Sequence, residues 1–291
     1  MTAFEYHRPR NLDEAVDLVA RFRDDARFLA GGTDLIVQMK RGRVAPRHLI
    51  ALQDVPGLDA IAVDGAVVLG AATTHRAIER TPAFAGALRC LIEGAQVIGG
   101  HQVRNVATVG GNLVNASPAA DLNPCLLALD GRVTLIGAGG ERELTVQEFL
   151  RGPNETARRH DELLTRMTLP ALAPRSASAF LKAGRRKAME ISVACVAVRL
   201  TLDSSGDRCL EARIALGAVA PTTMRARAAE QLLEGRSVTP AVFREAGQAA
   251  REACTPIDDV RASAEFRRHL TGVLVSRALE RCADRVRAAA T

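Results

Sequence analysis

Two short stretches of the sequence set adjacent glycines beside a threonine: AGGTDL at residues 30–35 and TVGGN at residues 108–112. Paired glycines let the backbone adopt positive φ and approach a ligand closely, and successive N–H groups can then converge on an anion. The first pair also leads into an expected helix, whose N-terminal amides favour phosphate oxygens. The residues therefore predict a nucleotide-like cofactor held between two loops. The alternative is that each glycine pair is only a tight turn.

The segment ATVGGNLVNASPAADLNP, residues 107–124, contains no Lys, Arg or His, although the chain carries a net charge of +6. An anion held there must be bound by backbone amides and hydroxyl groups. Asp121 could accept hydrogen bonds from a ribose or a ring N–H group, and Asn112 can both donate and accept.

Other catalytic patterns are missing from the sequence. There is no Walker A sequence, no Gly-x-Gly-x-x-Gly after a strand, no Gly-x-Ser-x-Gly and no His-Glu-x-x-His. His101 is a candidate acid–base residue, although a histidine beside Arg104 is more often structural. The basic run AGRRKAME, residues 183–190, is typical of a solvated turn, with a ligand or partner surface as the alternative.

Composition narrows the function classes further. The six cysteines stand far apart without a Cys-x-x-Cys pair, which favours buried free thiols over a metal or iron–sulfur site in this chain. The cations alternate with acids, and aromatic residues make up only 3%, so we do not expect a nucleic-acid partner. No apolar run is long enough to cross a bilayer and the first residues lack a signal-peptide core, so a cytoplasmic location is expected.

The elements that must position these residues can be predicted from periodicity and turn signals. A helix capped by Asn11 and Glu14 comes first, followed by a strand at 27–32, a helix at 35–40 and a strand at 48–53. Asp64-Gly65 indicates a hairpin. Further on we expect helices at 84–97 and 124–129, strands at 132–137 and 162–170, and a linker at 170–174.

The last third has a different pattern. Long strands are expected at 178–184, 191–202 and 210–221, and then three helices: 224–233, one starting at Thr239-Pro240, and a long one from Ser263. The last helix is expected to have one apolar face, made of Phe266, Leu270, Val273, Leu274, Cys282 and Val286.

At these residues the chain resembles a known family. LAGGTDLI, GGHQVRNVATVGGNLVNASPAADLNP, DELLTRMTLP, AFLKAGRR and IALGAVAPTTMRA are similar to the FAD-binding medium subunits of molybdenum hydroxylases, which include carbon monoxide and xanthine dehydrogenases. The resemblance implies an α+β fold, with a two-part FAD-binding domain of the vanillyl-alcohol-oxidase type at 1–173 (subdomains about 1–55 and 56–173). A C-terminal domain at 174–291, with a three-stranded sheet and a helical bundle, would follow.

The resemblance also implies non-covalent FAD and a set of residues around it. Two stretches would wrap the pyrophosphate: Phe28, Leu29, Ala30, Gly31, Gly32, Thr33, Asp34 and Leu35, and Thr108, Val109, Gly110, Gly111 and Asn112. Asp121 would contact the adenosine side, Ile98 and Leu164 would lie near the flavin ring, and Lys182 would reach the cofactor. Ile98 departs from the family, because some relatives carry an aromatic residue there that could stack on the ring.

Such subunits transfer electrons and do not touch the organic substrate. The implied partners are a large subunit with molybdopterin and a small subunit with [2Fe-2S] clusters, in a dimer of heterotrimers. The flavin would pass electrons to NAD, quinone or oxygen. Two alternatives stay open: a stand-alone FAD-dependent oxidase or dehydrogenase, for which His101 would be the acid–base candidate, and a scaffold subunit that has lost the flavin.

Overall fold

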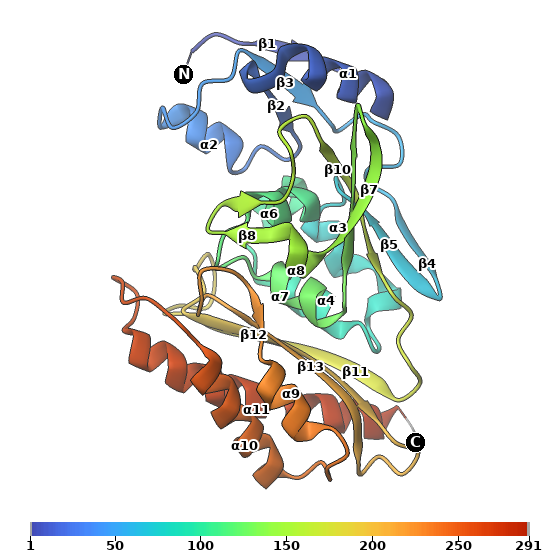
Figure 1. Cartoon of the computed structure of the whole chain (residues 1–291), viewed down its shortest axis with the longest axis vertical. Coiled ribbons are helices and arrows are strands. Elements are labelled where there is room, and N and C mark those ends of the chain that lie inside the picture. The colour runs from blue at the N-terminus through green and yellow to red at the C-terminus, as the bar shows by residue number, and fades with distance from the viewer. Residues whose placement is uncertain (1, 290–291) are drawn as a thin grey trace.

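The computed structural model describes residues 2–289, and its three larger sheets follow one another along its length (Figure 1). The N-terminal lobe, residues 5–51, is a parallel sheet of order β1-β3-β2. Its elements are β1 (Glu5–His7), α1 (Leu12–Phe22), the 3-10 helix η1 (Arg23–Asp25), β2 (Ala26–Leu29), α2 (Leu35–Lys40) and β3 (His48–Ala51).

Local signals explain most of this lobe. The Asn11 side chain accepts a hydrogen bond from the Glu14 N–H and starts α1, as predicted, while the Glu14 carboxylate accepts from the N–H of Arg10. Helix α2 has the predicted bounds. The sequence analysis missed β1, because three residues with no buried member carry too little periodicity.

The middle lobe, residues 61–169, contains an antiparallel sheet of order β4-β5-β10-β6-β7. The strands of this lobe are β4 (Ile61–Asp64), β5 (Ala66–Gly70), β6 (Arg132–Gly137), β7 (Gly140–Thr145), β8 (Leu150–Gly152), β9 (Glu155–Thr156) and β10 (Leu163–Leu169). Strands β8 and β9 form a separate two-stranded sheet. Gly65 turns the predicted β4–β5 hairpin with φ of 68°.

Short helices complete this lobe, and some of them, such as α4 and α7, contact the C-terminal sheet; one boundary differs from expectation. They are α3 (His75–Arg80), η2 (Pro82–Phe84), α4 (Arg89–Gln96), α5 (His101–Val106), α6 (Val109–Asn115), α7 (Leu122–Ala128) and α8 (Val146–Phe149). The helix predicted over 84–97 begins only at Arg89, because Phe84 closes the preceding 3-10 turn.

The C-terminal lobe, residues 176–288, is a sheet of order β11-β12-β13-β14 with three helices on one face (Figure 1). Its elements are β11 (Ser176–Ala183), β12 (Ala194–Leu202), β13 (Cys209–Gly217), β14 (Met224–Arg225), α9 (Arg227–Leu233), α10 (Pro240–Ala253) and α11 (Ala264–Ala288). Alternate residues of β12 enter two cores: Cys195 packs toward the middle lobe, and Val196 packs toward the helices.

Two details of this lobe depart from the sequence analysis. Residues 224–225 pair with β13 as a short fourth strand, so the helix predicted from Met224 begins at Arg227. Phe266, predicted on the apolar face of α11, is 51% exposed, whereas Leu274, Cys282 and Val286 of that face are buried. The face turns toward the sheet only after the first turn of the helix.

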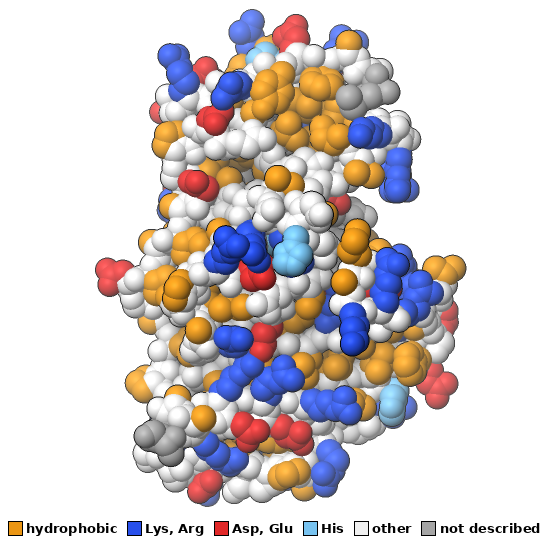
Figure 2. Space-filling model, turned by 180° about the vertical axis from the view of Figure 1, so that it is seen from behind, with side chains coloured by type: hydrophobic (Ala, Val, Ile, Leu, Met, Phe, Trp, Pro, Cys, Tyr) orange, Lys and Arg blue, Asp and Glu red, His pale blue; other side chains and the backbone are white. Residues whose placement is uncertain are grey.

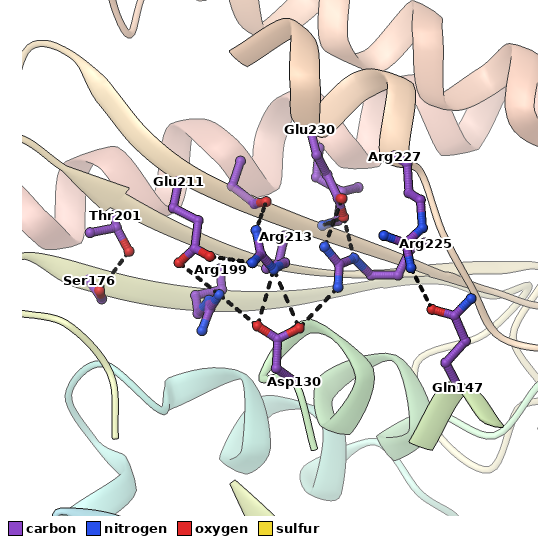
Figure 3. A network of polar contacts seen from close by, with 12 residues as sticks. Asp130, Gln147, Ser176, Arg199, Thr201, Glu211, Arg213, Arg225, Arg227 and Glu230 are labelled. Atoms are coloured by element: carbon purple, nitrogen blue, oxygen red, sulfur yellow. Dashed lines mark hydrogen bonds and ion pairs between the residues drawn. The ribbon is translucent and has the colours of Figure 1, made fainter. Parts of the chain in front are cut away.

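A polar cluster joins the C-terminal lobe to the middle lobe (Figure 3). It consists of Asp130 with Arg199, Arg213 and Arg225, and is called the Asp130 clasp below. Asp130, which follows α7, accepts hydrogen bonds from Arg199 of β12 at 2.9 Å, Arg213 of β13 at 3.1 Å and Arg225 of β14 at 3.0 Å. Arg225 also donates to Glu230 of α9 at 2.8 Å. One carboxylate of the middle lobe thus bridges three strands of the C-terminal sheet.

Candidate cofactor-binding site

The first glycine stretch connects the end of β2 to the start of α2. Gly32 has φ of 70°, a conformation that other residues rarely adopt. Gly31 lies against the end of α5: a Cβ on it would stand 1.9 Å from the carbonyl oxygen of Val106 and 2.9 Å from the Cα of Ala107. Glycine is required at both positions, for conformation at Gly32 and for close approach at Gly31.

The backbone donors of this stretch are unused. Among residues 2–289, no group accepts a hydrogen bond from the N–H groups of the five residues 31–35. The Asp34 side chain does not cap α2, so the first turn of this helix is left with its donors and its positive dipole end. Such a run of amides can hold an anionic oxygen.

The second stretch is the first turn of helix α6 and not a loop. Thr108 caps the helix by accepting the Gly111 N–H at 3.0 Å, and Gly110 donates to the carbonyl of Ala71 at 2.9 Å. The N–H groups of Val109 and Asn112 are likewise bonded, to Thr73 and Thr108 carbonyls. The expectation of a second amide nest with positive φ is therefore wrong.

Helix α6 can still offer side chains to a ligand. The Thr108 hydroxyl accepts one hydrogen bond and keeps its own proton to donate. The Oδ1 atom of Asn112 is buried and has no hydrogen-bond partner within residues 2–289. Gly110 is needed for packing, because a Cβ there would come within 2.6 Å of the Ala71 carbonyl oxygen.

The fold brings the two stretches and Leu164 into one region. The Val106 carbonyl that abuts Gly31 lies two residues before Thr108, the cap of α6. Ala71, which contacts Gly110, donates its N–H to the carbonyl of Thr165 at 2.9 Å, next to Leu164 on β10. Leu164 itself is 3% exposed, directly before an irregularity in the β10–β6 pairing.

Ile98 sits in the turn between α4 and α5, and Arg104 holds this turn. The Arg104 guanidinium donates to the carbonyls of Ile98 at 3.2 Å and Gly99 at 3.4 Å, and it pairs with Glu79 of α3 at 3.3 Å. Arg104 is only 6% exposed. The sequence analysis mentioned Arg104 only as a neighbour of His101, whereas the structure makes it the residue that positions Ile98.

Asp121 and Lys182 form an ion pair between the middle and C-terminal lobes. Lys182 donates to Asp121 at 2.7 Å and to the Glu190 carbonyl at 2.7 Å, and Ser192 donates to the other oxygen of Asp121. Burial raises the pKa of Asp121, and the Lys182 charge opposes that shift. Both side chains were expected to contact the cofactor separately, and here each is the other's partner.

A cavity of about 410 Å³ opens beside this ion pair. Lys182, Val97 and the basic run at 183–188 line it. The run that was expected to be a solvated turn is therefore exposed and also borders a cavity next to two predicted cofactor residues. Figure 2 shows many Lys and Arg side chains on one face of the molecule.

Two histidines near α6 differ in environment. His75, which the sequence analysis did not single out, is 1% exposed, and its Nδ1 atom has no partner among the described residues. Burial, and then the charge of Arg104, lower its pKa to about 4, so the ring is neutral at pH 7. His101 is exposed, and its Nδ1 lies 3.3 Å from the Arg104 guanidinium.

Comparison with known proteins agrees with this fold. Residues 2–172 match the family described as the FAD binding domain in molybdopterin dehydrogenase, and residues 179–282 match the CO dehydrogenase flavoprotein C-terminal domain. The chain therefore belongs to the FAD-binding medium subunits of the molybdenum hydroxylase family. It is a subunit of an oxidoreductase, and the predicted family and fold class are confirmed.

Particular relatives resemble almost the whole chain. The carbon monoxide dehydrogenase medium chain of Hydrogenophaga pseudoflava is 33% identical, with 96% of this chain and 98% of the relative covered. The putative xanthine dehydrogenase FAD-binding subunit of Escherichia coli is 32% identical, with 94% of each covered. The solved carbon monoxide dehydrogenase from Hydrogenophaga pseudoflava superimposes with a TM-score of 0.93 at 33% identity, covering 98% of both chains. Within residues 2–289, no helix is long and apolar enough to cross a membrane.

Proposed function

We propose that the chain binds FAD non-covalently, with its pyrophosphate at residues 28–35 and 108–112. The unpaired N–H groups of residues 31–35 carry this proposal, because successive backbone donors at the start of a helix can converge on pyrophosphate oxygens. On the neighbouring helix α6, the Oδ1 atom of Asn112 is buried and has no partner among the described residues. This supports a hydrogen bond that the ligand donates to Oδ1. The residues present thus fit the dinucleotide.

The remaining predicted residues have distinct proposed roles. Ile98 and Leu164 would pack against the flavin ring, and Arg104 would hold the Ile98 turn in place. Asp121 would face the adenosine side, held by Lys182, which would itself reach the cofactor. When bound, FAD supplies the chemistry that joins one-electron to two-electron transfer, while the protein supplies position and electrostatics.

We further propose that the subunit takes electrons from a [2Fe-2S] partner subunit and passes them to NAD, quinone or oxygen. A molybdopterin-containing large subunit would hydroxylate the substrate, in a cytoplasmic dimer of heterotrimers. The six cysteines are free and buried, which supports a reducing compartment and leaves no cluster ligands in this chain. Figure 2 shows hydrophobic side chains gathered on the N-terminal lobe, which supports a docking role. Tyr6 and Val37 are exposed large hydrophobic residues of this lobe.

The domain limits at 1–173 and 174–291 are also part of the proposal. They are supported by the separate sheets on either side of residues 170–175 and by the family matches, which end at residue 172 and resume at residue 179. A further division near residue 55 is supported by the parallel N-terminal sheet.

The cofactor proposal is tested by acid precipitation of the purified protein. We expect a colourless pellet and a yellow supernatant that contains FAD at one molecule per chain. Detection of FMN alone, or of no flavin after reconstitution with FAD, would contradict it.

The partner proposal is tested by purification at native expression level. We expect co-elution with a molybdenum-containing chain and a small iron–sulfur chain, and no oxidation of purines, aldehydes, N-heterocycles or carbon monoxide by the isolated subunit. A free monomer that oxidises substrate unaided would instead support the stand-alone oxidase.

A further inference from the structure

Two histidines and a glutamate converge on one face of the N-terminal sheet, away from the cofactor site. Glu5 and His7 are two residues apart on β1, so their side chains share a face, and His48 is the partner of Glu5 in the parallel β1–β3 register. The Nε2 atom of His7 lies 3.0 Å from the Nδ1 of His48. An oxygen of Glu5 lies 3.4 Å from that Nδ1 and 3.8 Å from the His7 Nε2.

These separations match the edges of a metal coordination polyhedron. A zinc ion about 2.0–2.1 Å from each ligand in tetrahedral geometry requires ligand atoms about 3.3 Å apart. The three measured distances bracket that value. Two imidazoles and a carboxylate with an open fourth position are a donor set that suits zinc and neighbouring first-row divalent ions.

The surroundings hold the ligands in position. The Phe22 ring stacks on His48 with centroids 3.7 Å apart and on His7 at 5.1 Å, which fixes both imidazole planes. The nearby cation Arg8 is paired with Asp54 at 2.6 Å, and within residues 2–289 no Lys or Arg pairs with the Glu5 carboxylate. The His7 and His48 side chains are 21% and 15% exposed, so an ion can reach them from solvent.

We propose that Glu5, His7 and His48 form a binding site for one divalent zinc-type ion, with water as the fourth ligand. The ion ties the short edge strand β1 to the central strand β3. Strand β1 has only three residues, so few hydrogen bonds hold it to β3. Three metal ligands from the two strands add to that pairing. Zinc binding therefore stabilises the N-terminal lobe, independently of whether flavin is bound.

The test uses full-length protein without a polyhistidine tag, stripped with a chelator and dialysed against Zn²⁺ at about pH 7.5, where ordinary imidazole is neutral. We expect one zinc per chain in the wild type, and its loss in both His7→Gln and His48→Gln. Glu5→Gln should weaken binding at least about tenfold, the loss that even outer-shell changes cause. His160→Gln and His269→Gln, exposed histidines elsewhere, are the matched controls and should keep the zinc.

A second measurement distinguishes loss of the zinc site from loss of the fold. Zn²⁺ should raise the melting temperature of the wild type and of both controls, and not that of His7→Gln, whose far-UV circular dichroism should match the wild type. Equal zinc content in the wild type, His7→Gln and His48→Gln, or no zinc in the wild type, would overturn the proposal.

Discussion

Gly31 joins the two halves of the candidate site by contact, since its α-carbon lies against the backbone of Val106 and Ala107. A methyl group there has no flexible side chain to displace, so the backbone itself must move. The same residue begins the run of unpaired N–H groups, so a shift of the backbone also displaces the donors.

We predict that Gly31→Ala lowers the free energy of unfolding by about 3 kcal/mol and removes most of the bound FAD. Gly86→Ala is the matched control, because nothing lies within 4 Å of its added Cβ and its φ is not positive. Urea unfolding and flavin content of the two variants provide the comparison. Wild-type flavin content in Gly31→Ala would show that this turn does not hold the cofactor.

His75 couples the stability of the fold to pH. Its pKa is about 4 in the folded protein, below the ordinary value near 6.5. Between these values the unfolded chain binds a proton that the folded chain does not, so stability falls as pH decreases through this window. The contribution is fully present above pH 6.5 and lost below about pH 4.

We predict a loss on the order of 3 kcal/mol between about pH 6.5 and pH 4 from this residue, from a shift of roughly 2.5 units. His75→Gln should make the unfolding free energy less dependent on pH in that range, while His160→Gln should leave the dependence unchanged. Denaturant unfolding at a series of pH values measures both. Identical pH profiles for the wild type and His75→Gln would refute the role of this histidine.

At the scale of elements, the segments that lead into helices α2 and α6 touch at Gly31 and Val106, and the two helices offer different donors. The first turn of α2 leaves its amides unpaired, whereas the amides of α6 are used internally and its side chains remain. An N-cap hydroxyl in α6 is therefore placed both to stabilise the helix and to donate to a ligand.

We predict that Thr108→Ala costs about 1 kcal/mol of stability and also weakens FAD binding. Thr145→Ala is the matched control: Thr145 caps α8 through a complete capping box, so its loss should cost a similar amount without affecting flavin affinity. Chemical denaturation and flavin titration of the apoprotein separate the two effects. Equal FAD affinity in both variants would assign Thr108 a capping role only.

At the scale of the whole molecule, the Asp130 clasp fixes the C-terminal sheet on the middle lobe (Figure 3). Three arginines share this single carboxylate, which is about one-third exposed. Asp130 has φ of 52°, a conformation that asparagine tolerates. Asp130→Asn thus removes the charge and keeps the backbone.

We predict that Asp130→Asn lowers the unfolding free energy by about 1–3 kcal/mol, because charge-assisted hydrogen bonds to partly buried arginines become neutral. Asp59→Asn, at an exposed carboxylate with no side-chain hydrogen bond or ion pair among residues 2–289, is the control for loss of a negative charge. Calorimetry should show a lower melting temperature for Asp130→Asn than for the wild type and for the control. An unchanged melting temperature would mean that the apolar contacts alone hold the lobes together.

The sequence by itself determined the elements with strong local signals. Asn11, Thr239 and Ser263 cap helices where they were predicted to, and Asp64-Gly65 turns its hairpin, because a cap or turn depends on a few adjacent residues. The motif block around residues 107–124 also indicated the family. The cofactor-binding residues implied by that resemblance, at 28–35 and 108–112, stay a prediction.

Only the tertiary structure decided which residues meet. The paired glycines at 110 and 111 indicated a loop, but they lie in the first turn of α6, where Gly110 packs against Ala71, a residue distant in the chain, and donates its N–H to the Ala71 carbonyl. The pairing of Asp121 with Lys182, the burial of His75 and the meeting of His7 with His48 also join residues from distant parts of the chain. No local pattern encodes such contacts, because packing and desolvation depend on what the whole chain places around each group.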